Sequence, residues 1–155
     1  MEDLAEACTI IRRLWTQAEP FDFHGARIDL TGTFGNPKPV QQPRPPILVA
    51  GRSAAVLRVA AEHAYLWNIA GGDIADAAQR SALLDRYCTE AGRDPAAIVR
   101  SIHLHVSYDE PDTTRGAIIE ALDAGFRHIT LGLPARPYPA GVARWVADEL
   151  IVKSV

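Results

Sequence analysis

The chain changes from strand to helix within Ile47-Leu48-Val49-Ala50-Gly51-Arg52-Ser53-Ala54. The first four residues form a continuous apolar run, which is typical of a short strand buried on both faces. Gly51-Arg52-Ser53 has turn composition, and residues 54–63 place Val56, Val59 and Ala60 on one side of a helix. The stretch therefore predicts a strand, a tight turn and a helix in direct succession.

The same alternation continues to the end of the chain. Asp73 is a helix start signal and Gly92 is a helix stop signal. Asp94-Pro95 is a second start signal, and Asp112 or Thr113 is expected to cap a later helix. Strands joined by helices in this order pair in parallel through right-handed crossovers. The expected strands are 47–50, 65–69, 101–107 and 126–131, and the expected helices are 54–63, 73–91, 112–124 and 139–152.

Residues 1–46 have a different pattern. Apolar residues at 3–4-residue spacing predict a helix over 3–17, and alternation over 21–30 predicts a short hairpin. Residues 31–46 hold five prolines and are expected to be an extended connector. We therefore expect one domain over 1–155, with helix, hairpin and connector in 1–46 and four β/α units in 47–155.

The length favours part of a barrel. Residues 47–155 give about 27 residues for each β/α unit, whereas a complete eight-unit barrel of roughly 250 residues has about 31. The fold class expected is α/β, a partial TIM barrel of about four units preceded by a helix and a β-hairpin. A small open α/β sheet is the alternative, and it needs helices on both faces.

Composition excludes several classes of protein. With 48% hydrophobic and 23% charged residues and a net charge of −3, the 155-residue chain is expected to be globular and not to bind nucleic acid. No apolar run approaches the ~20 residues that span a bilayer. Cys8 and Cys88 form no CxxC motif and are expected to be small buried hydrophobes. A reducing, cytoplasmic setting is therefore expected.

The turn at Gly51, Arg52 and Ser53 is the strongest site candidate. It follows the carboxyl end of a buried strand and opens a helix, whose free N–H groups and dipole favour an anion. Arg52 can add a charge and Ser53 a hydroxyl. The alternative is a plain turn with a serine cap, since the stretch is neither a Walker A nor a GxGxxG motif.

Several other polar residues have weaker functional interpretations. His103 and His105 share one face of a strand, so zinc binding is possible in principle, although a polar barrel lining or a solvent-facing pair is favoured. Asn68 is a modest site candidate, and Trp67 is either core filler or a ring-stacking platform. The remaining candidates are strand-start histidines, a rim arginine and a solvated acidic loop: His63, His128, Arg136, Asp109, Glu110 and Asp112.

Five stretches together resemble the luciferase-like monooxygenase superfamily, particularly its deazaflavin-dependent branch. The resemblance covers nearly the whole chain in the family's order. The matching stretches are Ile10-Ile11-Arg12-Arg13-Leu14-Trp15-Thr16 with Pro20-Phe21-Asp22-Phe23-His24-Gly25, then residues 37–51, residues 57–64 with Trp67-Asn68, residues 91–95, and residues 125–134.

This resemblance implies a TIM barrel with a flavin-type cofactor, coenzyme F-420 or FMN, at the carboxyl ends of the strands. The chain would supply strands five to eight, with the cofactor phosphate held by Ala50, Gly51, Arg52, Ser53 and Ala54. Trp67 and Asn68 would form part of the pocket wall. The family's ADGWN reads Ala64-Tyr65-Leu66-Trp67-Asn68 here, which puts the entry to that strand in doubt.

The implied function is that of the C-terminal half of a flavin- or deazaflavin-dependent oxidoreductase. The resemblance places most catalytic side chains in strands one to four, so it assigns no catalytic residue here. Half a barrel leaves strand edges and lumen uncovered, so a homo-oligomer or a separate N-terminal half is the expected partner. The alternatives are a catalytically inactive subunit that acts through assembly, and a small phosphate-sugar binding module.

Overall fold

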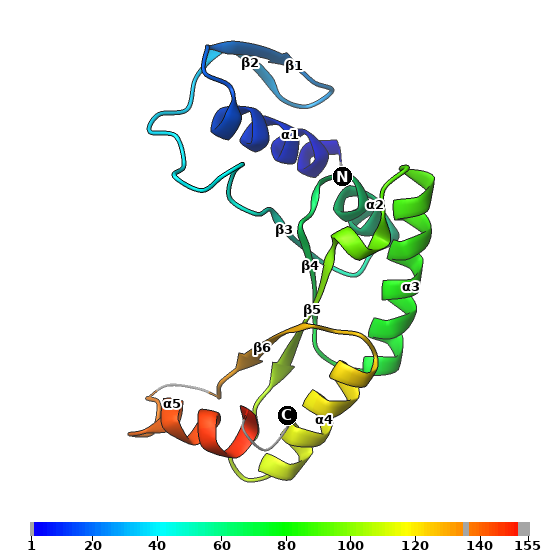
Figure 1. The fold of residues 1–155 in the computed structure, drawn as a ribbon, viewed down its shortest axis with the longest axis vertical. Coiled ribbons are helices and arrows are strands. Elements are labelled where there is room, and N and C mark those ends of the chain that lie inside the picture. The colour runs from blue at the N-terminus through cyan, green and yellow to red at the C-terminus, as the bar shows by residue number, and fades with distance from the viewer. Residues whose placement is uncertain (1, 135–136, 152–155) are drawn as a thin grey trace.

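The structure is a computed structural model that describes residues 2–134 and 137–151. It has a helix and a two-stranded hairpin followed by a sheet with helices (Figure 1). The elements, in chain order, are α1 (Glu2–Thr16), β1 (Phe21–His24), β2 (Asp29–Thr33), β3 (Leu48–Ala50), α2 (Ala54–His63), β4 (Leu66–Ala70), α3 (Ile74–Glu90), η1 (Pro95–Ala97), β5 (Val99–His105), α4 (Pro111–Asp123), β6 (His128–Gly132), α5 (Val142–Trp145) and η2 (Val146–Ile151).

The second sheet has the strand order β3-β4-β5-β6, and each neighbouring pair is parallel. Because consecutive strands are also neighbours in space, each connecting helix lies close to the strands that it joins. The prediction of four β/α units after a helix and a hairpin is confirmed.

Some boundaries differ from the prediction. Expected at 101, β5 begins at Val99, and α4 begins at Pro111 because a proline's fixed φ suits the first helical position. The predicted cap at Asp112 or Thr113 is therefore wrong, and Glu110 occupies the cap position without a side-chain hydrogen bond. The last helix begins at Val142, not at 139, and continues as the π-helical turn η2.

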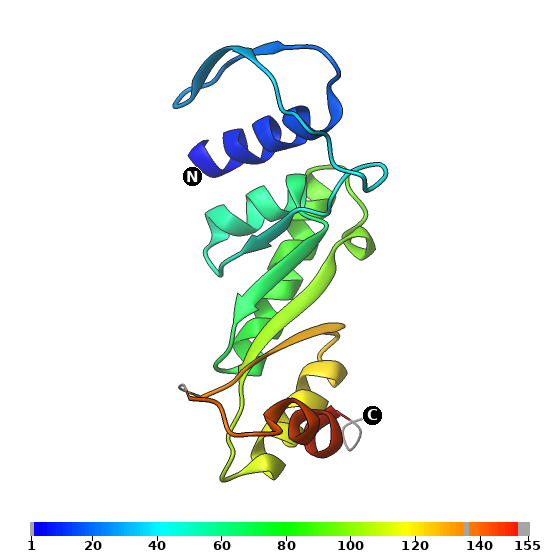
Figure 2. The ribbon, with the colours of Figure 1, turned by 90° about the vertical axis from the view of Figure 1, so that its left-hand side faces the viewer.

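The core lies between the sheet and its helices. Side chains that alternate along the strands point to this side, and Trp67, Ile69 and Ile102 among them are at most 1% exposed. Figure 2 looks onto the opposite side of the sheet, with α3 behind the strands. A two-sided open α/β sheet would need helices on that side as well. The one-sided packing favours the partial barrel.

The opposite side, here called the open face, carries the other alternating residues. Strand register aligns Ala50, Asn68, Ser101 and His128 in one row across all four strands. Ala50 is the last residue of β3, whereas His128 is the first residue of β6. The row therefore climbs along the strands, which is the stagger that a closing barrel requires.

Leu48, Leu66 and Val99 form a second, apolar row on the open face. Leu48, on the edge strand β3, is 53% exposed. The open face is thus the inner surface of a partial barrel, apolar at the start of β3 and polar further along.

Candidate functional site

The candidate site begins at the turn after β3, where Gly51 has a φ of 142°. Its N–H donates to the carbonyl of Asn68 at 3.0 Å, and its own carbonyl accepts the indole N–H of Trp67 at 2.8 Å. A Cβ at this position would lie 3.0 Å from Cγ1 of Val56. Backbone conformation and close approach both require glycine here.

Ser53 ends the turn and caps α2. Its Oγ accepts the N–H of Val56 at 3.3 Å, and its carbonyl accepts the N–H of Leu57 at 3.0 Å. The first N–H groups of a helix have no partner within it and carry its positive dipole end. The turn therefore presents backbone donors of α2 together with the Ser53 hydroxyl.

Arg52 is held beside this turn by Asp76 of α3. Its Nη2 lies 2.5 Å from Oδ2 of Asp76, and Oδ1 of the same carboxylate lies 3.4 Å from Nε of Arg80. The hydrogen bond from Arg52 holds the pKa of Asp76 below its usual range. Two arginines that share one carboxylate leave a net positive charge, so the donor set fits a phosphate.

Asn68 contributes a hydrogen-bonded row on the open face. Its Nδ2 donates to Ser101 Oγ at 2.7 Å, and Ser101 Oγ lies 2.8 Å from Nδ1 of His128. Ser101 is completely buried, and its hydroxyl has no other acceptor in the described part of the chain. The Ser101 hydroxyl thus joins the Asn68 amide to the His128 imidazole.

Ser101 is the residue that sequence reasoning missed, because nothing in its neighbourhood marks it as polar core. His128 was expected to be an ordinary strand-start residue. The signal that joins them is strand register, which pairs Asn68 with Ser101 and Ser101 with His128.

Trp67 is fully buried, with its ring 6.4 Å from that of Phe126. Its indole N–H donates to the Gly51 carbonyl in the turn, and its ring has no exposed surface in this structure. The interpretation of Trp67 as core filler is confirmed. Its assignment to the cofactor pocket stays a prediction, in which Trp67 acts through the turn that it holds.

The paired imidazoles of His103 and His105 lie further along the open face, with ring centroids 5.2 Å apart. A Cβ on Gly132 would lie 2.3 Å from His103 Nε2, a buried atom without a hydrogen-bond partner. Within residues 2–134 and 137–151, no three His, Cys, Asp or Glu side chains cluster closely enough to hold a metal ion.

The other candidates do not join the turn. Cys8 and Cys88 are free and buried, and burial raises the pKa of both thiols. Asp112 pairs with Arg115, and Glu110 accepts the Thr113 hydroxyl at 3.3 Å. Arg136 lies outside the described residues. Among those described, no helix is both long and apolar enough to cross a membrane.

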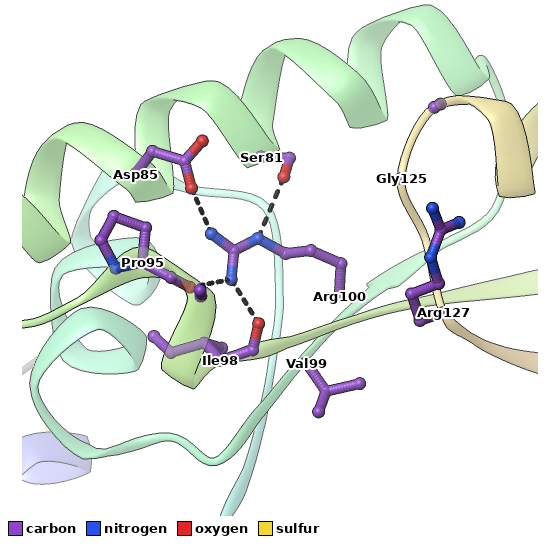
Figure 3. A pocket seen from close by; sticks show the side chains of 10 residues that line it. Ser81, Asp85, Pro95, Ile98, Val99, Arg100, Gly125 and Arg127 are labelled. Atoms are coloured by element: carbon purple, nitrogen blue, oxygen red, sulfur yellow. Dashed lines mark hydrogen bonds and ion pairs between the residues drawn. The ribbon is translucent and has the colours of Figure 1, made fainter.

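A cavity of about 550 Å³ lies near the starts of β5 and β6, away from the turn (Figure 3). Arg100 extends into it and donates to Ser81 Oγ at 3.0 Å and to the carbonyls of Pro95 and Ile98. It also pairs with Asp85. These contacts use its donors to join α3, η1 and β5, so we interpret the residue as structural.

The comparisons with known proteins agree with this architecture. Residues 1–147 match the model of the luciferase-like monooxygenase family, so the chain belongs to that family. The predicted family resemblance is confirmed.

Three solved structures show the same fold. An F420-dependent secondary alcohol dehydrogenase, in complex with an F420-acetone adduct, has a TM-score of 0.80 at 16% identity. Coenzyme F420-dependent tetrahydromethanopterin reductase from Methanopyrus kandleri scores 0.76 at 14% identity. The monooxygenase RslO1 from Streptomyces bottropensis scores 0.73 at 19% identity.

Each match covers 97% of this chain but only 61%, 64% and 60% of the other chain, respectively. The chain therefore spans about three fifths of the length of these structures. This is the relation that a partial barrel predicts.

Proposed function

We propose that the turn formed by Ala50, Gly51, Arg52, Ser53 and Ala54 holds the phosphate of a flavin-type cofactor, coenzyme F-420 or FMN, in a luciferase-like oxidoreductase. The observation that carries this proposal is the glycine turn. Hydrogen bonds with Asn68 and Trp67 hold it in place, and it brings the start of α2 and Arg52 together at the carboxyl end of β3. When bound, the cofactor ring supplies hydride or oxygen chemistry. This chain contributes the phosphate contacts.

The family membership and the F420-dependent relatives support this assignment. Parallel α/β folds also place ligands at the carboxyl ends of their strands, where Gly51 lies. Asn68 adds a polar side chain to the site from β4, and Trp67 stabilises the turn through its hydrogen bond to Gly51. The cytoplasmic setting stays a prediction.

The test is a fluorescence titration of the purified chain with coenzyme F-420, and with FMN in parallel. We expect saturable binding that Arg52→Gln weakens about tenfold, since a charged hydrogen bond contributes about 1.5–3 kcal/mol. Arg86→Gln is the matched control, because Arg86 is exposed on α3 and makes the same change of charge. A folded chain that binds neither cofactor contradicts the proposal.

The alternative is a catalytically inactive subunit that acts through assembly with itself or with a separate N-terminal half. The 53% exposure of Leu48 on the open face favours this candidate. Sedimentation distinguishes the two. A dimer without cofactor affinity supports the assembly role, whereas a monomer that gains activity with an N-terminal half supports the enzyme.

A further inference from the structure

Three arginines without an acidic partner gather at the end of α2. Arg12 comes from α1, Arg44 from the connector before β3, and Arg93 from the segment between α3 and η1. All three are half-buried. In the part of the chain that the structure describes, none of them has a carboxylate oxygen within 4 Å, whereas six other arginines do.

Hydrogen bonds fix the three side chains without neutralising them. Arg12 Nη2 lies 3.2 Å from Nδ1 of His63, the last residue of α2. Arg93 donates to the carbonyls of Ala61 and Ala64 at 3.0 and 2.6 Å. Arg44 donates only to the carbonyl of Pro45, at 3.1 Å.

Because a guanidinium is always protonated, Arg12 is the donor and His63 Nδ1 the acceptor. His63 is therefore neutral, with its proton on Nε2. Burial lowers the pKa of His63, the charge of Arg12 lowers it further, and Glu62 opposes both. Burial also lowers the pKa of Arg44, helped by the charges of Arg12 and Arg93.

The charges of Arg12 and Arg93 act on Arg44, and like charges that are partly withdrawn from water destabilise a fold unless an anion compensates them. Capping the carbonyl end of α2 explains Arg93 but not the other two, which donate to no carbonyl of that helix. The Nε of Arg12 is buried and has no hydrogen-bond partner among the residues that the structure describes. The cluster therefore carries an excess of positive charge, which the Glu62 carboxylate, 3.6 Å from His63 Nε2, offsets only in part.

The cluster lies at the other end of α2 from the cofactor turn. Arg44 precedes β3 and Arg93 precedes β5, and parallel strands begin at the same edge of their sheet. The charges of Arg12 and Arg93 both act on Arg44, so α1, the connector and the segment before η1 lie near one another at this edge. Ten residues of helix, about 15 Å, separate it from Gly51.

A cavity of about 390 Å³ adjoins the cluster at Arg44. It is lined by Gln41, Gln42, Pro43, Arg44, Pro46 and Tyr65. Proline rings and a half-exposed tyrosine beside a guanidinium suit a small organic group attached to an anion.

We propose that Arg12, Arg44 and Arg93 form a binding site for a small phosphate-bearing molecule, separate from the cofactor turn. A phosphate dianion accepts hydrogen bonds from several guanidinium groups at once. Its organic part lies in the cavity beside Tyr65. This assignment does not depend on the proposed cofactor site.

The test follows the His63 C2 proton by NMR across pH, with and without inorganic phosphate and then with phenyl phosphate. A bound phosphate favours the charged imidazolium, so we expect the pKa of His63 to rise. Phenyl phosphate binds more tightly than inorganic phosphate if the cavity takes the organic part. Succinate is the carboxylate comparison and is expected to bind more weakly.

Arg44→Gln is the decisive variant, because Arg44 bonds only to its neighbour's carbonyl and its loss spares α2. We expect it to weaken phosphate binding about tenfold, so the shift at His63 should need about ten times more phosphate. Arg44→Lys, which keeps the charge but loses the planar fork, is expected to lie between Arg44→Gln and the wild type. Arg86→Gln, the matched change of charge on α3, is expected to leave binding intact.

Arg52→Gln separates this site from the cofactor turn: it is expected to weaken binding of coenzyme F-420 while the phosphate effect at His63 persists. An unchanged His63 titration in saturating phosphate overturns the proposal, as does a shift that needs no more phosphate in Arg44→Gln than in the wild type. Tighter binding of succinate than of phosphate overturns the assignment to phosphate.

Discussion

The indole N–H of Trp67 donates to the carbonyl of Gly51 at 2.8 Å, so the buried core of the second β/α unit fixes the turn between β3 and α2 of the first. The turn itself is exposed, but its anchor is a fully buried side chain on the neighbouring strand. The packing of the core and the geometry of the turn therefore both depend on the position of Trp67.

Trp67→Phe tests that coupling. The ring is largely kept, but the Gly51 carbonyl loses its donor, which should cost about 1–3 kcal/mol. We expect lower stability in urea together with weaker coenzyme F-420 binding. Trp15→Phe is the control, a half-buried tryptophan on α1. Equal cofactor affinity in Trp67→Phe and wild type contradicts the coupling.

Substitutions of Ser53 separate capping from anion binding. Ser53→Ala loses the cap and should cost about 1 kcal/mol, whereas Ser53→Asp keeps a good cap. The aspartate also places a negative charge where the phosphate is proposed to lie. We expect Ser53→Asp to retain the wild-type midpoint of thermal unfolding and to lose cofactor binding. Undiminished binding in Ser53→Asp places the phosphate elsewhere.

Asp76 gives a prediction for pH dependence. The bond from Arg52 lowers the pKa of Asp76 in the folded protein below its unfolded value. Its contribution to stability is therefore complete above the unfolded pKa and is lost as the pH falls through the folded one. Asp76→Asn lacks this contribution at every pH.

We thus expect wild type to be more stable than Asp76→Asn at neutral pH, with the difference disappearing in acid. Thermal unfolding of both chains over a series of pH values measures it. A difference that stays constant into acid would mean that the Asp76 side chain acts through packing and not through its charge.

Glu6 holds the hairpin to α1. Its carboxylate accepts the N–H groups of Ala26 at 2.6 Å and Ile28 at 2.8 Å, and also that of Arg27. Glu6→Gln replaces one acceptor oxygen by a donor, so amide hydrogen exchange at Ala26 and Ile28 should accelerate. Glu19→Gln, an exposed change of the same kind, should leave both rates unaltered. Protection that persists in Glu6→Gln contradicts this role.

The local features of the fold were predictable from the sequence. Apolar runs, Asp73 as a cap and glycine stops describe neighbouring residues, and such signals placed the strands and helices to within a few positions. The turn at Gly51 was recognisable for the same reason, because strand, turn and helix follow one another directly. Pro111 is the first residue of α4, although the polar residues after it, Asp112 and Thr113, predicted a later start.

Contacts between distant residues were not predictable in this way. Arg52 and Asp76 are 24 positions apart, and Arg12 meets His63 across 51. The row through Asn68, Ser101 and His128 depends on the register in which neighbouring strands pair. A slip by one residue would turn every member to the other face.

Ser101 provides the sharpest test of that row. Ser101→Ala leaves the Asn68 amide and His128 Nδ1 without their partner, and we expect a loss of about 1–3 kcal/mol. Asn68→Ala alone should cost less, because its side chain is only half-buried. In the double variant the costs should fall short of their sum by about 0.5 kcal/mol or more, since neighbours in one network couple. Urea unfolding of the four chains closes this cycle, and strict additivity would mean that Asn68 and Ser101 are adjacent but do not act as a hydrogen-bonded unit.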